Sequence, residues 1–146
     1  MILVWLIVIP MLAGLLAWIV GKNSNLFARW ISVLGIGFDL VISVWLWIKY
    51  FAGVDLSQTE SWLVQIKASL IPDLGIIFHL AIDGISLLMI ILTALLGLIS
   101  IIISWSEIQR RVAFFHFNIM WILAGILGVF MAMDLFLFYF FWEMML

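Results

Sequence analysis

The sequence predicts an all-α fold, a polytopic transmembrane helix bundle with four full spans and a truncated fifth. Hydrophobic residues make up 68% of the 146 residues, charged residues make up 10%, and the mean hydropathy is +1.40. Soluble domains are about 45–50% apolar and about 25% charged, so this composition excludes a soluble globular chain or a disordered one. The apolar residues also fall into long runs, and a membrane-spanning helix needs about 20 of them in succession.

The first two spans are predicted at Met1 to Val20 and at Trp30 to Ile48. The first run carries no charge. It makes a poor signal peptide, because no Lys or Arg precedes it and no small-residue cleavage site follows it. The second run is interrupted only by Asp39. Both runs are therefore expected to remain in the membrane as helices.

The third and fourth spans are predicted at Gly84 to Trp105 and at Val112 to Met133, on either side of a short polar turn. The apolar run that starts the fourth span continues to Leu146. As one helix it would reach about 52 Å, which is too long for a single span. Asp134 divides the run, because an aspartate before an apolar helix is a good N-cap.

The fifth span follows Asp134 and is short. The remaining 12 residues reach about 18 Å as a helix, whereas the bilayer core is about 30 Å thick. The chain would then end inside the hydrocarbon with a bare carboxylate, which is costly. We therefore expect residues 1–146 to be the amino-terminal part of a longer membrane subunit.

The more polar segment between the second and third spans is predicted to hold two short elements. Trp62, Ile66 and Leu70 recur at every fourth residue, which predicts a short interfacial helix ended by Pro72. Apolar residues alternate over Phe78–Asp83, which predicts a short strand.

Basic residues in the connections predict the orientation of the chain, because cytoplasmic loops carry an excess of Lys and Arg. The connections after the first and third spans hold more of them than the segment between the second and third spans. The protein is therefore expected to be multi-pass with its amino terminus outside. The first group is Lys22, Arg29, Arg110 and Arg111, and the second is Lys49 and Lys67.

Several kinds of function are excluded by what the sequence lacks. Zero cysteines exclude disulfides and thiolate metal sites, and a net charge of −2 without basic clusters argues against nucleic acid as a partner. No phosphate-binding glycine loop, Ser-His-Asp pattern or H-E-x-x-H motif is present. His79 and His116 are too few for a haem or metal cluster. We therefore expect no metal and no cofactor in this chain, and the lipid bilayer as its surroundings.

Glu143 is the strongest candidate for chemistry. It lies nine residues after Asp134, about 13 Å into the fifth helix and close to the bilayer midplane. A charge there costs about 2.5–3.5 kcal/mol, so the neutral carboxyl is favoured until a cation approaches and makes it release its proton. This behaviour fits a proton-relay site better than the alternative, a packing group hydrogen-bonded to a neighbouring helix. Tyr139, one turn earlier, is a possible donor to it.

Asp39 is the second candidate and lies midway along the second span. Gly35, Asp39 and Ser43 recur at every fourth residue and share one helix face. Such a small, polar face should turn toward other helices rather than toward lipid. Two interpretations stay open: a secondary proton-relay acid, or a buried packing group paired with another helix.

The other polar residues of the spans are given structural interpretations. Asp134 and Glu143 lie on opposite faces of their helix, so they do not form a carboxylate pair, and Asp134 and Asp83 are expected to act as caps. His116 is expected to form interfacial hydrogen bonds. Two stripes of small residues are expected to be helix-packing seams. The stripes are Ser86, Thr93, Gly97, Ser100 and Ser104 in the third span, and Ala124, Gly128 and Ala132 in the fourth.

Two stretches of this chain resemble a known family of membrane proteins. H-L-A-I-D-G-I-S-L-L-M at 79–89 resembles the opening of the third helix in antiporter-like membrane subunits, and D-L-F-L-F-Y-F-F-W-E-M-M-L at 134–146 resembles their fifth helix. F-F-H-F-N at 114–118 also matches. The resemblance extends over the whole chain. Its W-E-M-M-L ending favours the subunit M branch of the bacterial NADH–quinone oxidoreductases, or respiratory complex I.

This resemblance implies a function in proton translocation. The family's subunits form the membrane arm, where proton movement is coupled to electron transfer from NADH to quinone in other subunits. Glu143 matches the family's essential fifth-helix glutamate, which works against a lysine on a later helix that this sequence does not contain. NADH, flavin, iron–sulfur clusters and quinone are then expected in partner subunits, and the location is the bacterial inner membrane. Asp39 is not part of the family's relay.

Rival functions remain open. Subunits of multisubunit Na⁺/H⁺ antiporters and of membrane-bound hydrogenases share the fifth-helix glutamate and the D-G-x-S motif. A small structural or assembly protein of the membrane would instead use Glu143 only for packing.

Overall fold

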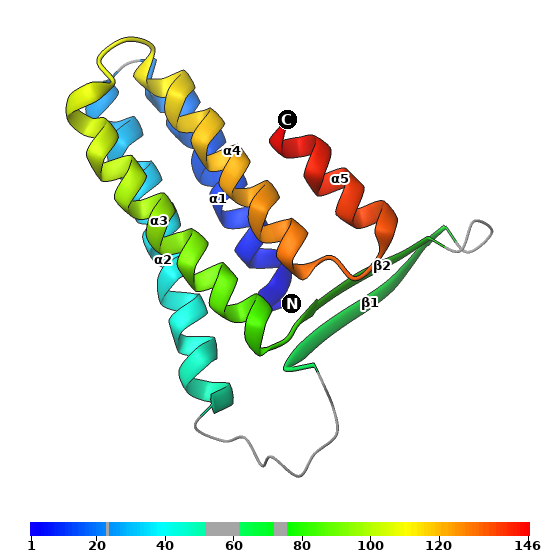
Figure 1. Cartoon of the computed structure of the whole chain (residues 1–146). Coiled ribbons are helices and arrows are strands. Elements are labelled where there is room, and N and C mark those ends of the chain that lie inside the picture. The colour runs from blue at the N-terminus through cyan, green and yellow to red at the C-terminus, as the bar shows by residue number, and fades with distance from the viewer. Residues whose placement is uncertain (23, 52–61, 72–75) are drawn as a thin grey trace.

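Four long apolar helices form the body of the protein (Figure 1). The computed structural model describes residues 1–22, 24–51, 62–71 and 76–146. Each of the four helices is long and apolar enough to cross a membrane, which confirms the predicted bundle of four spans. The helices are α1 (Ile2–Val20), α2 (Asn25–Phe51), α3 (Gly84–Glu107) and α4 (Val112–Met131).

A fifth and shorter apolar helix, α5 (Leu135–Met145), lies beside α4 (Figure 1). Glycines in α4 allow this approach. A Cβ atom added at Gly128 would lie 2.4 Å from ring carbons of Phe141, and one at Gly125 would lie 2.6 Å from Met145 Cγ. Gly128 therefore belongs to a helix-packing seam, as predicted, and the seam holds α5.

Aspartate caps begin two of the helices. Asp83 Oδ1 accepts a hydrogen bond of 2.8 Å from the backbone N–H of Ser86, and Asp134 Oδ1 accepts from Phe136 and Leu137 at 2.9 and 3.4 Å. These bonds satisfy backbone donors that a first helical turn leaves free. Hydrogen bonding from Ser86 also lowers the pKa of Asp83, so the carboxylate is charged near neutral pH. Both predicted caps are confirmed.

The segment between α2 and α3 contains a β-hairpin rather than a helix and a strand. Strand β1 (Val64–Ile71) pairs antiparallel with β2 (Ile76–Ile82), and Lys67 lies opposite His79. The strand predicted at Phe78–Asp83 is confirmed. The interfacial helix predicted from Trp62 to Leu70 is wrong, and its predicted end, Pro72, lies outside the described residues.

The physical reason for this error is the spacing of the apolar residues. A repeat of four is also a multiple of two, so Trp62, Ile66 and Leu70 share one face of a strand as readily as one face of a helix. Val64 and Ile66 are β-branched and favour extended backbone. Pairing with β2, which follows later in the sequence, selects the strand over the helix.

The hairpin is fastened to the bundle at the end where α4 passes into α5 (Figure 1). The backbone N–H of Met133 donates to the carbonyl of His79 at 3.0 Å, and Leu80 forms an isolated bridge with Ala132. Leu80 and Ile82 are fully buried and join the core of the bundle. The hairpin thus closes this end of the helices.

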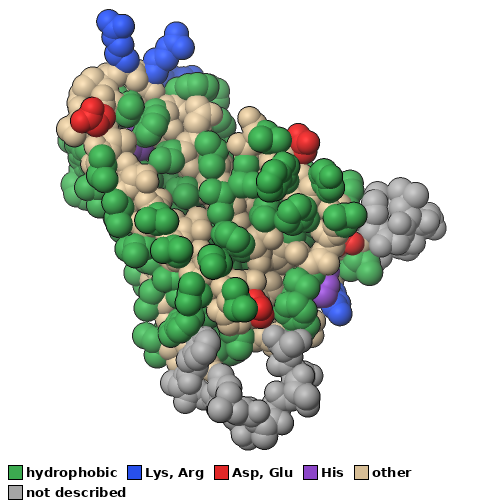
Figure 2. Space-filling model, in the orientation of Figure 1, with side chains coloured by type: hydrophobic (Ala, Val, Ile, Leu, Met, Phe, Trp, Pro, Cys, Tyr) green, Lys and Arg blue, Asp and Glu red, His purple; other side chains and the backbone are tan. Residues whose placement is uncertain are grey.

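At the opposite end of the bundle, Arg29 links α2 to the connection between α3 and α4. Its guanidinium donates to the carbonyl of Ile108 at 3.0 Å and to Gln109 Oε1 at 3.4 Å, and it lies 5.6 Å from the ring centroid of Trp105. The start of α2 is therefore bound to the connection between α3 and α4. Lys and Arg side chains project from this end, while the flank shown is largely hydrophobic (Figure 2).

Candidate functional site

Among the residues that the structure describes, five polar side chains lie in the interior of the bundle, and two of them are titratable. Three serines satisfy their hydroxyl groups by donating to carbonyls of their own helices, at 2.7 to 3.0 Å. Asp39 is 0% exposed and His116 is 1% exposed. These two residues are the candidates for chemistry inside the bundle. The serines are Ser32, Ser43 and Ser104.

Asp39 faces a tight seam between three helices. One turn earlier, a Cβ atom added at Gly35 would lie 2.5 Å from Ala13 Cβ in α1 and 3.2 Å from Met120 Cε in α4. The predicted inward orientation of this face is confirmed. Both carboxyl oxygens of Asp39 are buried without a hydrogen-bond partner among the residues that the structure places. Ser43, on the same face, donates to the backbone carbonyl of Asp39 instead.

His116 lies deeper than the sequence indicated. Its Nδ1 is buried and has no hydrogen-bond partner within the described parts of the chain. The side chain is 1% exposed, so its predicted place at the interface is wrong. The signal that places it inside is the helical repeat of the buried face, which runs through Val112, His116, Met120, Leu123 and Leu127.

Glu143 is presented on the outer face of α5. Its neighbours Phe141 and Met145 pack against Gly128 and Gly125 of α4, so the carboxyl points away from the bundle and is exposed. The α4 contacts fix the register of α5 without using the Glu143 side chain.

The two predicted site residues are not brought together. Asp39 is enclosed by the bundle, whereas Glu143 lies on its surface with Tyr139, which is 59% exposed. Within the placed residues, no hydrogen bond joins the Tyr139 hydroxyl to Glu143. Each carboxyl is therefore a separate candidate site.

His79 in β2 is the titratable histidine outside the spans. Burial lowers its pKa, the charge of Lys67 on the opposite strand lowers it further, and Asp134 acts in the other direction. The imidazole is therefore neutral at neutral pH. Among residues 1–22, 24–51, 62–71 and 76–146, no three His, Asp or Glu side chains are grouped as a metal site would require.

Curated relatives match the whole length of this chain, although no protein-family model matches it. It is 51% identical to NADH-quinone oxidoreductase subunit M of Pseudomonas aeruginosa and 46% identical to that of Escherichia coli strain K12. The NAD(P)H-quinone oxidoreductase chain 4 1 of Synechococcus elongatus is 30% identical over 95% of this chain and 25% of its own length. The chain spans 29% of the length of the two subunit M relatives.

Two solved structures share the fold. One is a chain of the membrane-bound sulfane sulfur reductase, an archaeal respiratory membrane complex. It matches with a TM-score of 0.80 at 16% identity, over 99% of this chain and 28% of that one. The other is a chain of respiratory complex I from Thermus thermophilus with bound NADH. It matches with a TM-score of 0.73 at 23% identity, over 97% of this chain and 26% of that one.

Proposed function

Because the chain belongs to the subunit M family of NADH-quinone oxidoreductases, we propose that it forms the amino-terminal part of a proton-translocating subunit in the membrane arm of such a complex. The observation that carries this proposal is the 51% identity over the whole chain. NADH oxidation and quinone reduction would take place in partner subunits that hold the flavin and iron–sulfur clusters. The bacterial sources of the relatives support a location in the bacterial inner membrane.

Glu143 is the proton-transfer residue of this proposal. Its carboxyl stands on a helix whose start is capped by Asp134 and whose inner face is fixed against α4. A carboxyl group holds a proton and passes it to a neighbouring acceptor when an approaching cation stabilises the carboxylate. When the cation withdraws, the carboxylate takes up another proton. The exposed face of α5 leaves room for such a partner from outside these helices.

The rival functions are distinguished by the relatives rather than by the fold. A sulfane sulfur reductase complex shares the fold at 16% identity, so the fold alone does not select the reaction. The curated relatives named above are quinone oxidoreductase subunits, which favours that function over an Na⁺/H⁺ antiporter or a hydrogenase.

Purification of the affinity-tagged protein from membranes of its source organism tests this function. We expect it to co-purify with NADH:quinone reductase activity, and vesicles that contain the complex should acidify when NADH and quinone are supplied. An eluate that exchanges Na⁺ for H⁺ without oxidising NADH would identify an antiporter instead. Absence of the protein from the active complex would identify an assembly protein.

Asp39 is proposed as a secondary proton-carrying acid. A buried polar group without a hydrogen bond costs about 1–3 kcal/mol of stability, and functional sites are where proteins tolerate such a cost. We expect Asp39→Leu to raise the free energy of unfolding by about 1–3 kcal/mol and to lower the number of protons translocated per NADH.

The matched control for Asp39 is Ser43→Ala, on the same buried face, which should change neither quantity appreciably. Denaturant titration measures the stability, and dye quenching in vesicles measures the protons. A loss of stability in Asp39→Leu would mean that the carboxyl has a structural partner. Unchanged proton translocation would remove the relay assignment.

A further inference from the structure

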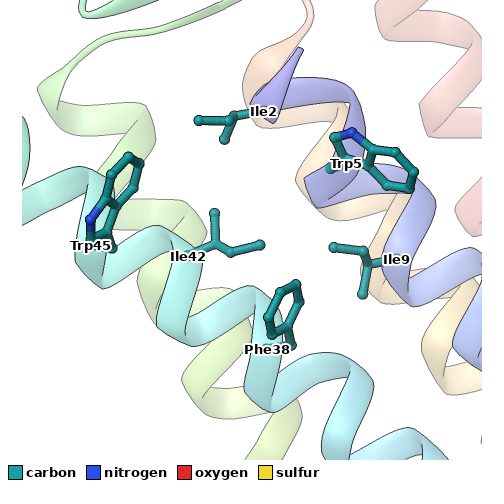
Figure 3. Close-up of a pocket in the computed structure, with 6 residues that line it drawn as sticks. All are labelled: Ile2, Trp5, Ile9, Phe38, Ile42 and Trp45. Carbon is teal, nitrogen blue, oxygen red and sulfur yellow. The ribbon is translucent and has the colours of Figure 1, made fainter.

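An apolar groove of about 390 Å³ runs along the outer side of the bundle between α1 and α2 (Figure 3). Its side chains come from both helices, and Trp5, Phe38 and Trp45 are about half exposed. The six lining residues are Ile2, Trp5, Ile9, Phe38, Ile42 and Trp45.

The groove is about two-thirds as long as one leaflet of the hydrocarbon core is thick. Ile2, Trp5 and Trp45 lie toward one end of it, and Ile9 and Phe38 lie toward the other (Figure 3). Seven residues separate its ends along each helix, which is about 10 Å of helix. One leaflet contributes about 15 Å to the hydrocarbon core. The groove therefore spans most of the depth of a leaflet.

The positively charged side chain of Lys49 lies beyond one end of the groove. Lys49 Nζ lies 5.1 Å from the ring centroid of Trp45, which lines the groove, and 5.5 Å from that of Tyr50. Lys49 is one helical turn, about 6 Å, past Trp45. Lys49 is in the last turn of α2, and lysines and aromatic residues near the ends of spanning helices meet lipid headgroups. Within the described segments, no carboxylate forms an ion pair with Lys49.

The sizes of the lining residues favour a lipid tail over another helix. Helices that pack in membranes approach through small residues. The seams of this bundle follow that rule, with Gly35 against Ala13 and Gly97 against Leu123. The groove has no lining residue smaller than isoleucine. Its surface suits a thin, flexible chain better than the backbone of a helix.

We propose that this groove binds one acyl chain of an anionic phospholipid and that Lys49 contacts its phosphate. The site is separate from Glu143 and does not depend on the function proposed above. A single Lys near an anionic headgroup contributes about 1 kcal/mol, which corresponds to about a fivefold change in affinity.

Native mass spectrometry of the full chain, titrated with dioleoyl phosphatidylglycerol or dioleoyl phosphatidylcholine, tests the proposal. We expect one phosphatidylglycerol to bind about fivefold more tightly than phosphatidylcholine. Lys49→Gln should abolish this preference. Lys22→Gln is the matched control, because Lys22 Nζ lies 5.2 Å from the Trp18 ring in the same kind of contact but outside the groove. The control should retain the preference.

Filling the groove gives a second test. Ile42→Trp should weaken the binding of both lipids, whereas Ile102→Trp on the exposed side of α3, where Ile102 is 52% exposed, should not. Equal lipid preference in Lys49→Gln and Lys22→Gln would overturn the proposal. So would unchanged lipid binding in a folded Ile42→Trp chain, because the lipids would then bind outside the groove. If Ile42→Trp fails to fold, the comparison of Lys49→Gln with Lys22→Gln alone tests the proposal.

Discussion

Glu143→Gln is expected to lower proton translocation by the assembled complex at least about 10-fold, because glutamine keeps the shape of the side chain but cannot release a proton. The side chain is exposed and its α5 neighbours make the contacts with α4, so the substitution removes no packing contact within these helices. The effect should therefore fall on proton transfer rather than on folding. Quenching of a pH-sensitive dye in vesicles supplied with NADH and quinone measures it.

The control for Glu143→Gln is Glu107→Gln, which neutralises an exposed acid at the end of α3. This control should pump at the normal rate. A native gel verifies that both variants assemble in equal amounts. Undiminished pumping in Glu143→Gln would remove the proton-transfer assignment, and equal losses in the two variants would indicate a general charge effect.

Gly128→Ala is expected to destabilise the protein by about 1–3 kcal/mol, because the added methyl group has no room. Its Cβ would lie 2.4 Å from ring carbons of Phe141, so α5 must move away from α4. Denaturant titration of the purified chain measures the loss. A second substitution, Phe141→Leu, makes room and should restore part of the stability in the double variant.

Gly37→Ala is the matched control, since it makes the same change in α2 where nothing lies within 4 Å of the added Cβ. Alanine favours helix over glycine, so this variant should gain up to about 1 kcal/mol. Similar stability of the Gly128→Ala and Gly37→Ala variants would mean that α5 does not pack against α4 as described.

The spans and caps were predictable from the sequence because they depend on local properties. Long apolar runs determine the helices, and Asp83 and Asp134 act on donors two or three residues away. The hairpin was not predictable from Trp62 to Leu70 alone, since its backbone bonds are made with β2 and the residue spacing suits either structure.

The candidate site was predictable only in part. The inward face of Asp39 follows from the repeat of Gly35, Asp39 and Ser43, but its lack of a partner depends on which side chains α1 and α4 bring to it. The outward direction of Glu143 also depends on tertiary packing. Both faces of α5 are apolar, and the glycines of α4 select the one that is buried.

The hydrogen bonds that join helices at opposite ends of the bundle have a consequence for how water reaches its interior. Arg29 ties α2 to the turn after α3, and the bond from Met133 to His79 ties the hairpin to the end of α4. Parting the helices at either end would break hydrogen bonds at that end. A path for water to Asp39 that leaves both sets of bonds intact would therefore open between side chains in the middle of the bundle.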